Sequence, residues 1–319
     1  MPAAPKPVLL VKLRGIGDSV LSLPSVEALG RLFPGSPLDV VVPPASAGVF
    51  DRDPRVRSVL VHDKARAGWS GFMALAGDLR ARGYGLAFCP HASFRTALLG
   101  RLSGAARRSV RNHSGSDWFN TVACPVAKEP KSIVEREFDG LRALGWQGPP
   151  PPVRMALGPE GRAWASAWRR RQAGPKRGLV LLAPGGSVPE RRWAPERFAA
   201  LAAGLSRAGL RPVWVTAPGE RLPPPPLKGL LLAQPPDVQA LGALARRAGA
   251  LVGNNSGPRH VAAACGARTL TLFASDLPRE WHPYPDRVRH RYLRPADGDL
   301  AALRPAVVLA EALAWAKAR

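Results

Sequence analysis

The fold of this chain is decided by Gly253-Asn254-Asn255-Ser256-Gly257-Pro258-Arg259-His260, which directly follows the apolar run Ala250-Leu251-Val252. The apolar run predicts a buried strand, the small polar residues predict a loop, and Pro258 is typical of the first turn of a helix. Ser256 is expected to cap that helix, which leaves backbone N–H groups and the positive end of the helix dipole facing the loop. Such a terminus favours anions, so we predict a phosphate or diphosphate site, with the two basic residues that end the stretch as additional donors. The alternative is an ordinary capped helix with a surface histidine.

The same order of strand, loop and helix recurs along the whole chain. Apolar runs predict the strands, and apolar residues at helical spacing predict the helices. The expected strands span 8–13, 38–42, 56–61, 86–89, 179–183, 212–216, 230–233, 250–252 and 269–273, and the expected helices span 20–33, 72–82, 132–144, 159–172, 195–208, 238–248, 258–265 and 300–318. This alternation predicts an α/β protein with parallel sheets and with ligand-binding loops at the carboxyl ends of the strands.

A proline run, 149–152, divides the chain into two halves. Four consecutive prolines can form neither a helix nor a central strand. We therefore predict two Rossmann-like parallel-sheet domains, 1–148 and 149–319, which face each other across a cleft. The last expected helix, 300–318, is a candidate to pack back on the first domain.

The chain carries 46 Lys and Arg against 23 Asp and Glu, a formal net charge of +23. This excess predicts an anionic partner: a phosphorylated substrate, an anionic membrane surface or a nucleic acid. Genome composition is a competing explanation, because 38 of the 46 are Arg and because Ala, Gly and Pro are abundant. A nucleic-acid binder gathers its basic residues on one face with aromatic residues between them, whereas here they are spread along the sequence. We therefore expect an anionic partner but no nucleic acid.

The sequence contains three cysteines, Cys89, Cys124 and Cys265, at wide spacing in apolar surroundings. An odd number without a C-x-x-C pair forms neither a disulfide framework nor a metal site, which is typical of the reducing cytoplasm. No apolar run approaches the ~20 residues that a membrane span needs. Residues 1–7 contain no long apolar region and do not predict a secretory signal. We expect a cytoplasmic protein.

The first loop of the chain, Arg14-Gly15-Ile16-Gly17-Asp18, follows the strand expected at 8–13. A dinucleotide fingerprint requires glycine where this chain has Val20, so that interpretation is weak. Asp18 is expected at the N-terminus of a helix, pointing into the cleft. It is either a helix cap or a general base, since a carboxylate at the mouth of a sheet can take a proton from a substrate hydroxyl.

A second glycine loop, Pro184-Gly185-Gly186-Ser187, follows the strand expected at 179–183. Its glycines allow the backbone to approach a phosphate closely, and its serine can donate a hydrogen bond. Arg191 and Arg192 follow, and a guanidinium can hold two phosphate oxygens at once. The alternative is a solvated charged turn.

Three other groups resemble sites but are interpreted as structural. Asp51-Arg52-Asp53 has the spacing of a metal motif, but Pro54 follows it and we predict a solvated turn. Asp297-Gly298-Asp299 predicts a turn before the last helix. His91 follows the strand at 86–89 and can line the cleft, although a structural histidine is the preferred interpretation. No catalytic-triad order, metal cluster or Walker loop occurs in the sequence, so we predict no metal.

Taken together, these segments resemble the heptosyltransferases of glycosyltransferase family 9, which add heptose to the inner core of lipopolysaccharide. The resemblance covers most of the chain. It depends on three motifs in this order and spacing: 11–21 with Pro24, 184–187 leading to Arg191-Arg192-Trp193 and Phe198, and 253–260 with Ala262-Ala263. No single motif is specific, but the combination is.

The resemblance implies the GT-B fold, an active site in the cleft, and inverting transfer from ADP-heptose without a metal. Asp18 matches the base of the family, and Arg191 stands where the family usually has Lys near the diphosphate. The predicted donor-binding residues are Gly185, Ser187, Arg191, Asn255, Ser256, Gly257 and His260. The predicted acceptor-side residues are Arg14, Gly15, Gly17 and His91.

Position 255 departs from the family, which usually has Asp there in contact with the hydroxyl groups of the donor sugar. Asn255 therefore leaves two alternatives open: an enzyme of the same fold that uses another nucleotide sugar, such as an epimerase, or a non-catalytic sugar-nucleotide binder. The implied acceptor is a lipid-linked or phosphorylated glycan at the inner membrane face. A cytoplasmic protein that meets this acceptor would be peripheral to the inner membrane, which would explain part of the positive charge. We expect a monomer.

Overall fold

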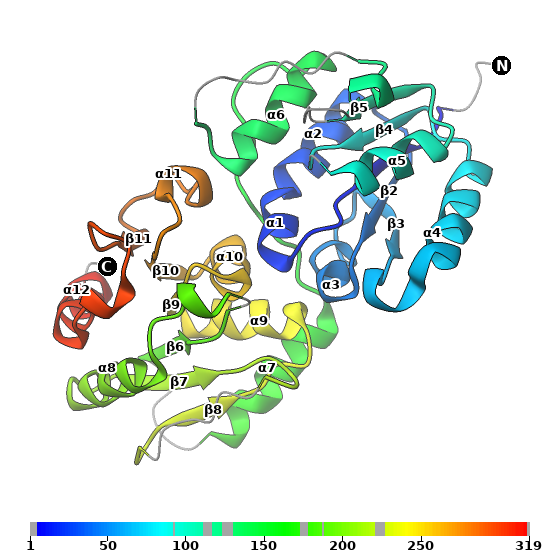
Figure 1. Cartoon of the computed structure of the whole chain (residues 1–319). Coiled ribbons are helices and arrows are strands. Elements are labelled where there is room, and N and C mark those ends of the chain that lie inside the picture. The colour runs from blue at the N-terminus through cyan, green and yellow to red at the C-terminus, as the bar shows by residue number, and fades with distance from the viewer. Residues whose placement is uncertain are drawn as a thin grey trace. The chain divides into compact units, whose positions relative to one another are not determined.

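The structure is a computed structural model that describes residues 5–91, 93–110, 117–122, 130–172, 178–186, 188–220 and 227–317. It divides into two compact units, Met1–Val153 and Arg154–Arg319, and the boundary falls directly after the proline run. Each unit is built on its own sheet, and all the strand pairs are parallel (Figure 1). The prediction of an α/β fold with two parallel sheets is confirmed.

The N-terminal unit has a five-stranded sheet with the order β3-β2-β1-β4-β5. Its strands are β1 (Val8–Val11), β2 (Leu38–Val42), β3 (Val56–Val61), β4 (Leu86–Cys89) and β5 (Arg107–Val110). Its helices are α1 (Ile16–Leu21), α2 (Leu23–Leu32), η1 (Pro44–Ser46), α3 (Ala47–Phe50), α4 (Lys64–Ala81), α5 (Phe94–Leu102), η2 (Asp117–Phe119) and α6 (Ile133–Ala143). Every residue of the central strand β1 is buried, which explains why its sequence is an unbroken apolar run.

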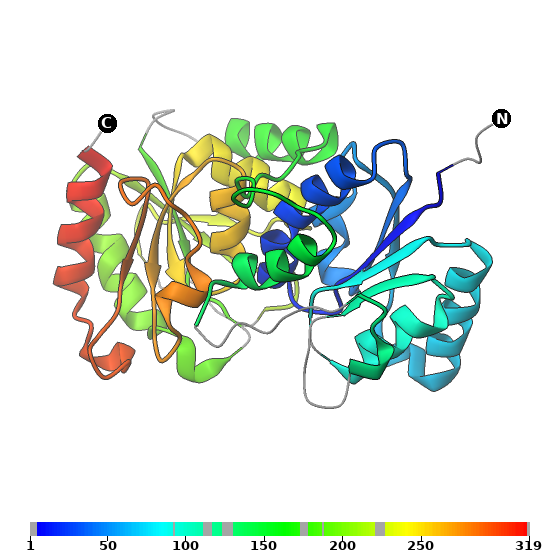
Figure 2. The same ribbon diagram turned by 90° about the horizontal axis from the view of Figure 1, so that it is seen from above.

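In the N-terminal unit, α4 packs with α5 and α2 packs with α6 (Figure 2). Helices α4 and α5 share one core cluster with β1, in which Phe72 and Leu99 pack with Leu9. Helices α2 and α6 contact each other. The single helix predicted over 20–33 is in fact two, α1 and α2, which meet at Ser22. This break leaves α1 as a short helix that carries Asp18 in its first turn.

The C-terminal unit has a six-stranded sheet with the order β11-β10-β9-β6-β7-β8. Its strands are β6 (Leu179–Ala183), β7 (Arg211–Val215), β8 (Leu231–Ala233), β9 (Ala250–Asn254), β10 (Arg268–Leu272) and β11 (His290–Leu293). Its helices are α7 (Pro159–Arg171), η3 (Pro189–Arg191), α8 (Pro195–Arg207), α9 (Val238–Ala248), α10 (Gly257–Ala264), α11 (Pro278–Trp281), η4 (Leu300–Ala302) and α12 (Pro305–Lys317). Strands β9 and β6 are central, so the loops after them leave the middle of the sheet.

The last helix packs within the C-terminal unit. Val308 and Trp315 of α12 belong to the same core cluster as Phe198 and Leu201 of α8. The sequence offered this helix as a candidate to pack back on the first domain, and the structure shows that its apolar residues complete the core beside α8. The helix predicted over 300–318 is also interrupted, since Pro305 starts a new helix after η4.

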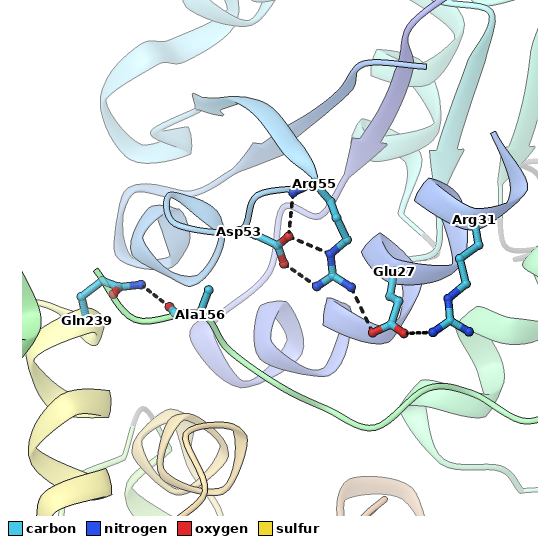
Figure 3. A network of polar contacts seen from close by, with 6 residues as sticks. All are labelled: Glu27, Arg31, Asp53, Arg55, Ala156 and Gln239. Atoms are coloured by element: carbon cyan, nitrogen blue, oxygen red, sulfur yellow. Dashed lines mark hydrogen bonds and ion pairs between the residues drawn. The ribbon is translucent and has the colours of Figure 1, made fainter. Parts of the chain in front are cut away.

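The segment after the proline run is fixed to α9 by one side chain. Gln239 accepts a hydrogen bond from the Gly158 backbone N–H at 2.8 Å. It also donates one to the Ala156 carbonyl at 3.0 Å (Figure 3). Both ends of the amide are therefore satisfied by the chain that enters α7. Within the described ranges, no helix combines the length and the apolar content needed to cross a bilayer.

Candidate functional site

Three loops of the C-terminal unit meet at the N-terminus of α10. Asn254, the last residue of β9, is buried and bridges the other two loops. Its Oδ1 accepts from the Trp193 backbone N–H at 2.9 Å, and its Nδ2 donates to the Pro184 carbonyl at 2.7 Å. Arg192 Nε donates to the Gly186 carbonyl at 2.7 Å. These bonds hold the glycine loop and the segment around Trp193 beside α10. They use the Nε–H of Arg192, which the sequence offered as a phosphate ligand.

Helix α10 begins at Gly257, with Ser256 at the cap position and Pro258 in the first turn. The prediction that Ser256 caps the helix with its side chain is wrong, because its Oγ instead lies 3.4 Å from the Asn254 carbonyl. A Cβ added to Gly186 would lie 3.9 Å from the Cβ of Ser256, so the glycine loop reaches this terminus. The first-turn N–H groups receive no side-chain cap, and an anion can supply the missing acceptor.

Gly185 has a packing role that the sequence did not indicate. A Cβ at this position would lie 2.1 Å from Oε1 of Glu220, so no other residue fits without displacing that side chain. Glu220 is itself held, since its Oε2 accepts from the Ala217 backbone N–H at 3.0 Å. The neighbouring prediction, Ser187, lies outside the described residues.

Arg191 and Asn255 belong to one chain of polar contacts. Arg191 ends η3, and its Nη1 lies 2.9 Å from Oδ1 of the buried Asp276. The other oxygen of Asp276 accepts from Asn255 Nδ2 at 2.9 Å. Asn255 Oδ1 in turn accepts from Arg259 Nε at 3.1 Å and Nη2 at 2.7 Å. An amide suits position 255 because its oxygen accepts from the guanidinium of Arg259, while its nitrogen donates to the carboxylate of Asp276.

Arg259 lies inside the protein. Its side chain is fully buried, donates to the Trp281 carbonyl, and lies 5.2 Å over the ring of Phe273. Burial lowers the pKa of this guanidinium to about 10. The expectation that Arg259 is a donor beside the anion site is therefore wrong, because its hydrogen bonds are used by Asn255 and by the backbone.

His260 is also buried, which excludes the surface histidine considered from the sequence. Its Nδ1 lies 2.8 Å from the hydroxyl of Tyr284. Burial, with Arg259 and His282 nearby, holds the pKa of His260 well below its usual range, so the ring is neutral. Burial likewise raises the pKa of Tyr284, whose hydroxyl keeps its proton. A neutral histidine can contribute a hydrogen bond to a ligand, but no charge.

In the N-terminal unit, Asp18 lies in the first turn of α1 and is partly exposed. The cap position belongs to Gly15, which has no side chain, so Asp18 is not the cap. Its Oδ1 lies 3.9 Å from Lys12 Nζ and 3.9 Å from Arg14 Nε. Two cationic side chains therefore lie beside this carboxylate.

Lys12 is held by a buried carboxylate that the sequence did not reveal. Its Nζ donates to Glu137 Oε1 at 2.6 Å. Ser22 Oγ donates to the same oxygen at 2.7 Å, and Ser25 Oγ donates to Oε2 at 2.6 Å. Helix α6 thus supplies Glu137 to a site formed by β1, α1 and α2, and the cation beside Asp18 is fixed in place.

The predicted acceptor-side residues lie in two places within the N-terminal unit. Gly15 is exposed, and a Cβ added to it would meet nothing within 4 Å, while Gly17 lies in α1. The carbonyl of Arg14 accepts from Ser46 Oγ at 3.3 Å. His91 follows β4, is half-buried and has an interaction partner, as a structural histidine would.

Within the metal-like motif at 51–53, Asp51 and Arg52 lie in the exposed turn that the sequence predicted, but Asp53 does not. Asp53 is buried, and its carboxylate accepts from Arg55 Nε at 2.7 Å and Nη2 at 2.6 Å (Figure 3). Arg55 also donates to Glu27 at 3.0 Å, which raises its pKa together with the Asp53 contact. Asp297 does lie in a turn, and Asp299 caps η4, where its carboxylate accepts from the Ala301 backbone N–H. Across the described part of the chain, no three His, Cys, Asp or Glu residues are grouped as metal ligands.

Comparison with known proteins gives a consistent result. The sequence model described as "Glycosyltransferase family 9 (heptosyltransferase)" matches residues 72–296. Lipopolysaccharide heptosyltransferase 3 of Escherichia coli is 23% identical over 295 residues, which are 85% of this chain and 84% of that protein. The crystal structure of a family 9 glycosyl transferase from Veillonella parvula superposes with a TM-score of 0.86 at 21% identity, covering 99% of this chain and 98% of the other. ADP-heptose lipopolysaccharide heptosyltransferase II of E. coli gives a TM-score of 0.82 at 20% identity, covering 97% and 98%.

Proposed function

The chain belongs to glycosyltransferase family 9, and from this premise we propose that it transfers a heptose-type sugar from ADP-heptose to a lipopolysaccharide core or related glycan. The names of the relatives support this assignment, since they are lipopolysaccharide heptosyltransferases and one is named for ADP-heptose. The transfer inverts the anomeric centre and uses no metal. The acceptor is lipid-linked or phosphorylated and lies at the inner membrane face of a cytoplasmic enzyme that acts as a monomer.

One observation carries the proposal: Asn254 fixes two loops beside a helix terminus that has no side-chain cap. The terminus offers backbone N–H groups at Ser256 and Gly257, and Arg191 offers a guanidinium. A nucleoside diphosphate needs both kinds of group, because its negative charge grows as it leaves. The neutral ring of His260 adds a hydrogen bond at most.

The donor must exchange one contact on entry. Arg191 is paired with Asp276, and its side chain is 41% exposed. A diphosphate offers the guanidinium more negative charge than one carboxylate does, so we expect Arg191 to move from Asp276 to the phosphate. Asp276 stays in place through Asn255 and is then free to accept a hydrogen bond from a hydroxyl group of the donor.

Asp18 performs the proton transfer. It removes the proton from the acceptor hydroxyl, the hydroxyl oxygen forms a bond to the anomeric carbon, and the bond from that carbon to the diphosphate oxygen breaks. The electron pair of the broken bond goes to the leaving ADP, where the helix terminus and Arg191 stabilise it. Lys12 and Arg14 lie beside the Asp18 carboxylate and orient it. Arg14, Gly15, Gly17 and His91 are the residues that we assign to the acceptor side.

The donor is tested by thermal unfolding with a panel of nucleotide sugars. A ligand present at a hundred times its dissociation constant adds ~2.7 kcal/mol to the free energy of unfolding, so the true donor gives the largest shift. We expect ADP-heptose to give that shift and then to be consumed in the presence of a lipopolysaccharide core acceptor. A larger shift with a uridine or guanosine sugar would instead favour the second candidate, an enzyme with another donor, which Asn255 keeps open.

Metal independence has its own test. Because Arg191 and the α10 terminus are proposed to stabilise the leaving diphosphate, we expect transfer to continue at an unchanged rate in excess chelator. Loss of transfer that magnesium, manganese or ferrous iron restores would contradict this part of the proposal.

A further inference from the structure

Arg259 is a fully buried guanidinium that the transfer reaction, as described above, does not use. It lies in the first turn of α10, and its hydrogen-bond partners are neutral groups. They are Oδ1 of Asn255, the carbonyl of Trp281 and Nδ1 of His282, the last at 3.4 Å. Burying a cation is costly unless its charge and its donors are compensated, so a buried guanidinium among neutral partners calls for a role other than ion pairing.

The guanidinium is held in one direction by residues that follow β10. His282 Nε2 lies 2.9 Å from the His290 carbonyl, which can only accept, so Nε2 carries the proton and donates it. Burial, with Arg259 nearby, lowers the pKa of His282 to about 3, so the ring is neutral and its Nδ1 is left as an acceptor for Arg259. The ring of Phe273 lies 5.2 Å from the guanidinium on another side. Arg259 therefore has a fixed orientation inside the unit.

The fixed guanidinium decides which way the amide of Asn255 points. A guanidinium can only donate, so the atom of Asn255 that faces it must be the oxygen. Oδ1 accepts from Arg259 Nε at 3.1 Å and from Nη2 at 2.7 Å, which directs Nδ2 to Oδ2 of Asp276 at 2.9 Å. With both lone pairs of Oδ1 in use, Asn255 has no side-chain acceptor left for a hydroxyl group of a ligand.

Asp276, by contrast, keeps acceptor positions on both of its oxygens. An ionised carboxylate can accept about four hydrogen bonds. Among the described residues, Oδ1 of Asp276 is paired with Arg191 and Oδ2 accepts from Asn255. If Arg191 moves to a diphosphate, Oδ1 is uncovered, while Asn255 still holds the carboxylate in place.

Asn255 and Asp276 also lie where a sugar bonded to that diphosphate must lie. Strands β9 and β10 pair in parallel with Asn254 opposite Leu272, and the Asn255 backbone N–H donates to the Leu272 carbonyl at 3.1 Å. Helix α10, whose N-terminus is the proposed diphosphate site, begins at the same edge of the sheet (Figure 1). Because the donor sugar is bonded directly to the diphosphate, its hydroxyl groups come within reach of this edge.

We propose that Arg259 is a positioning residue that, through Asn255, makes Asp276 the residue that recognises the donor sugar. The free acceptor positions on the two carboxylate oxygens fit two neighbouring hydroxyl groups of a neutral sugar. The same carboxylate disfavours a sugar that carries a carboxylate of its own, because like charges repel. This assignment rests on the proposed transfer from a nucleotide sugar and adds the residues that distinguish one sugar from another.

The experiment is calorimetry of the full-length protein with ADP and with ADP-heptose, in the absence of an acceptor. The dissociation constant of ADP divided by that of ADP-heptose isolates the contribution of the sugar. In Asp276→Asn this ratio should fall by at least about tenfold, because a neutral amide replaces a charged acceptor for the hydroxyl groups. The affinity for ADP alone should not fall, since Arg191 loses a competitor. The matched control is Asp299→Asn, an exposed cap of η4 in the same unit, which should leave the ratio unchanged.

The role of Arg259 is tested with two substitutions of similar length. Arg259→Met removes the donors that orient Asn255, so the ratio should fall by about three- to tenfold, the range for a neutral hydrogen bond, while the affinity for ADP is kept. Arg259→Lys should recover part of the ratio, because an ammonium group can still donate to Asn255 Oδ1. A merely structural role would weaken the binding of ADP and ADP-heptose equally.

Two results would overturn the inference and leave the proposed function intact. One is a wild type that binds ADP-heptose, together with an unchanged ratio in Asp276→Asn. The other is an equal loss of affinity for ADP and ADP-heptose in Arg259→Met. Binding of neither ligand by the wild type would instead contradict the proposed function, and this assignment with it. Only variants with the wild-type near-ultraviolet circular dichroism spectrum are compared, and if Arg259→Met does not fold, Asp276→Asn and Arg259→Lys decide the question.

Discussion

Glu137 and Asp276 are both buried carboxylates next to a residue of the proposed mechanism, but their partners differ. Glu137 accepts from Lys12, Ser22 and Ser25, which are all buried. Asp276 accepts from Asn255 and from Arg191, a residue that is partly exposed. The partners of Glu137 can change only if the core opens, whereas Arg191 can leave Asp276 through solvent. The first carboxylate therefore fixes a geometry, and the second can exchange a partner for a ligand.

The largest effect is expected at the residue that Glu137 helps to position. Asp18→Asn keeps the shape of the side chain but removes the base, so the transfer rate should fall by about 10²–10⁴, while donor affinity stays within a few-fold. Steady-state kinetics and calorimetry with ADP measure the two quantities separately. Asp63→Asn is the matched control, since that residue also lies at a helix start but caps α4. Near-normal turnover of the Asp18 variant would leave this residue without a catalytic role.

The second effect tests whether Glu137 fixes the geometry. Glu137→Gln removes the carboxylate that lies 2.6 Å from the buried Lys12 ammonium and leaves it only the more distant Asp18 at 3.9 Å among the described anions, so the free energy of unfolding should fall by about 3–5 kcal/mol. Urea denaturation measures the loss, and Glu135→Gln on the same helix is the control, because its contact with Arg142 is exposed and should matter by less than about 1 kcal/mol. Similar losses in the two variants would mean that Glu137 is no more structural than a surface charge.

The third effect tests whether Arg191 can leave Asp276 and bind the donor diphosphate. Arg191→Ala should weaken ADP binding by about 1.5–3 kcal/mol, the range for hydrogen bonds to charged groups, and Arg191→Lys should recover much of it. Asp276→Asn should instead strengthen ADP binding, because the carboxylate no longer competes for the guanidinium. Calorimetry with ADP decides between these outcomes. An unchanged affinity for ADP in Arg191→Ala would mean that Arg191 pairs with Asp276 and does not contact the diphosphate.

These contacts also mark the limit of what the sequence could predict. The stretch at 253–260 was recognisable because its strand, loop and helix signals are local, and β9 and α10 lie where they were expected. Glu137 was not recognisable, since it meets Lys12 across 125 residues of sequence and lies on a helix like any other glutamate. Asp276 meets Asn255 and Arg191 only because two parallel strands and a loop bring them together.

Side-chain direction was the second limit. Arg259 and His260 were correctly placed at the start of a helix, but the sequence does not show that both point inward among Phe273 and Tyr284. The strands β5 and β11 were missed for a related reason. Both lie at sheet edges and contain basic residues, so neither has the apolar run that identified the central strands.

The smallest effect is expected at Asn255, the amide that donates a hydrogen bond to Asp276. In Asn255→Asp, a carboxylate replaces the group that donates to Asp276 at 2.9 Å, so two like charges meet and a hydrogen bond is lost. We expect the free energy of unfolding to fall by about 1–2 kcal/mol. Adding Asp276→Asn should restore it, because Asn at 276 can donate to Asp at 255 and accept from Arg191, while Asp at 255 still accepts from Arg259. Urea denaturation of both single variants and the double variant forms a thermodynamic cycle, and additive losses would show that the two positions are not coupled.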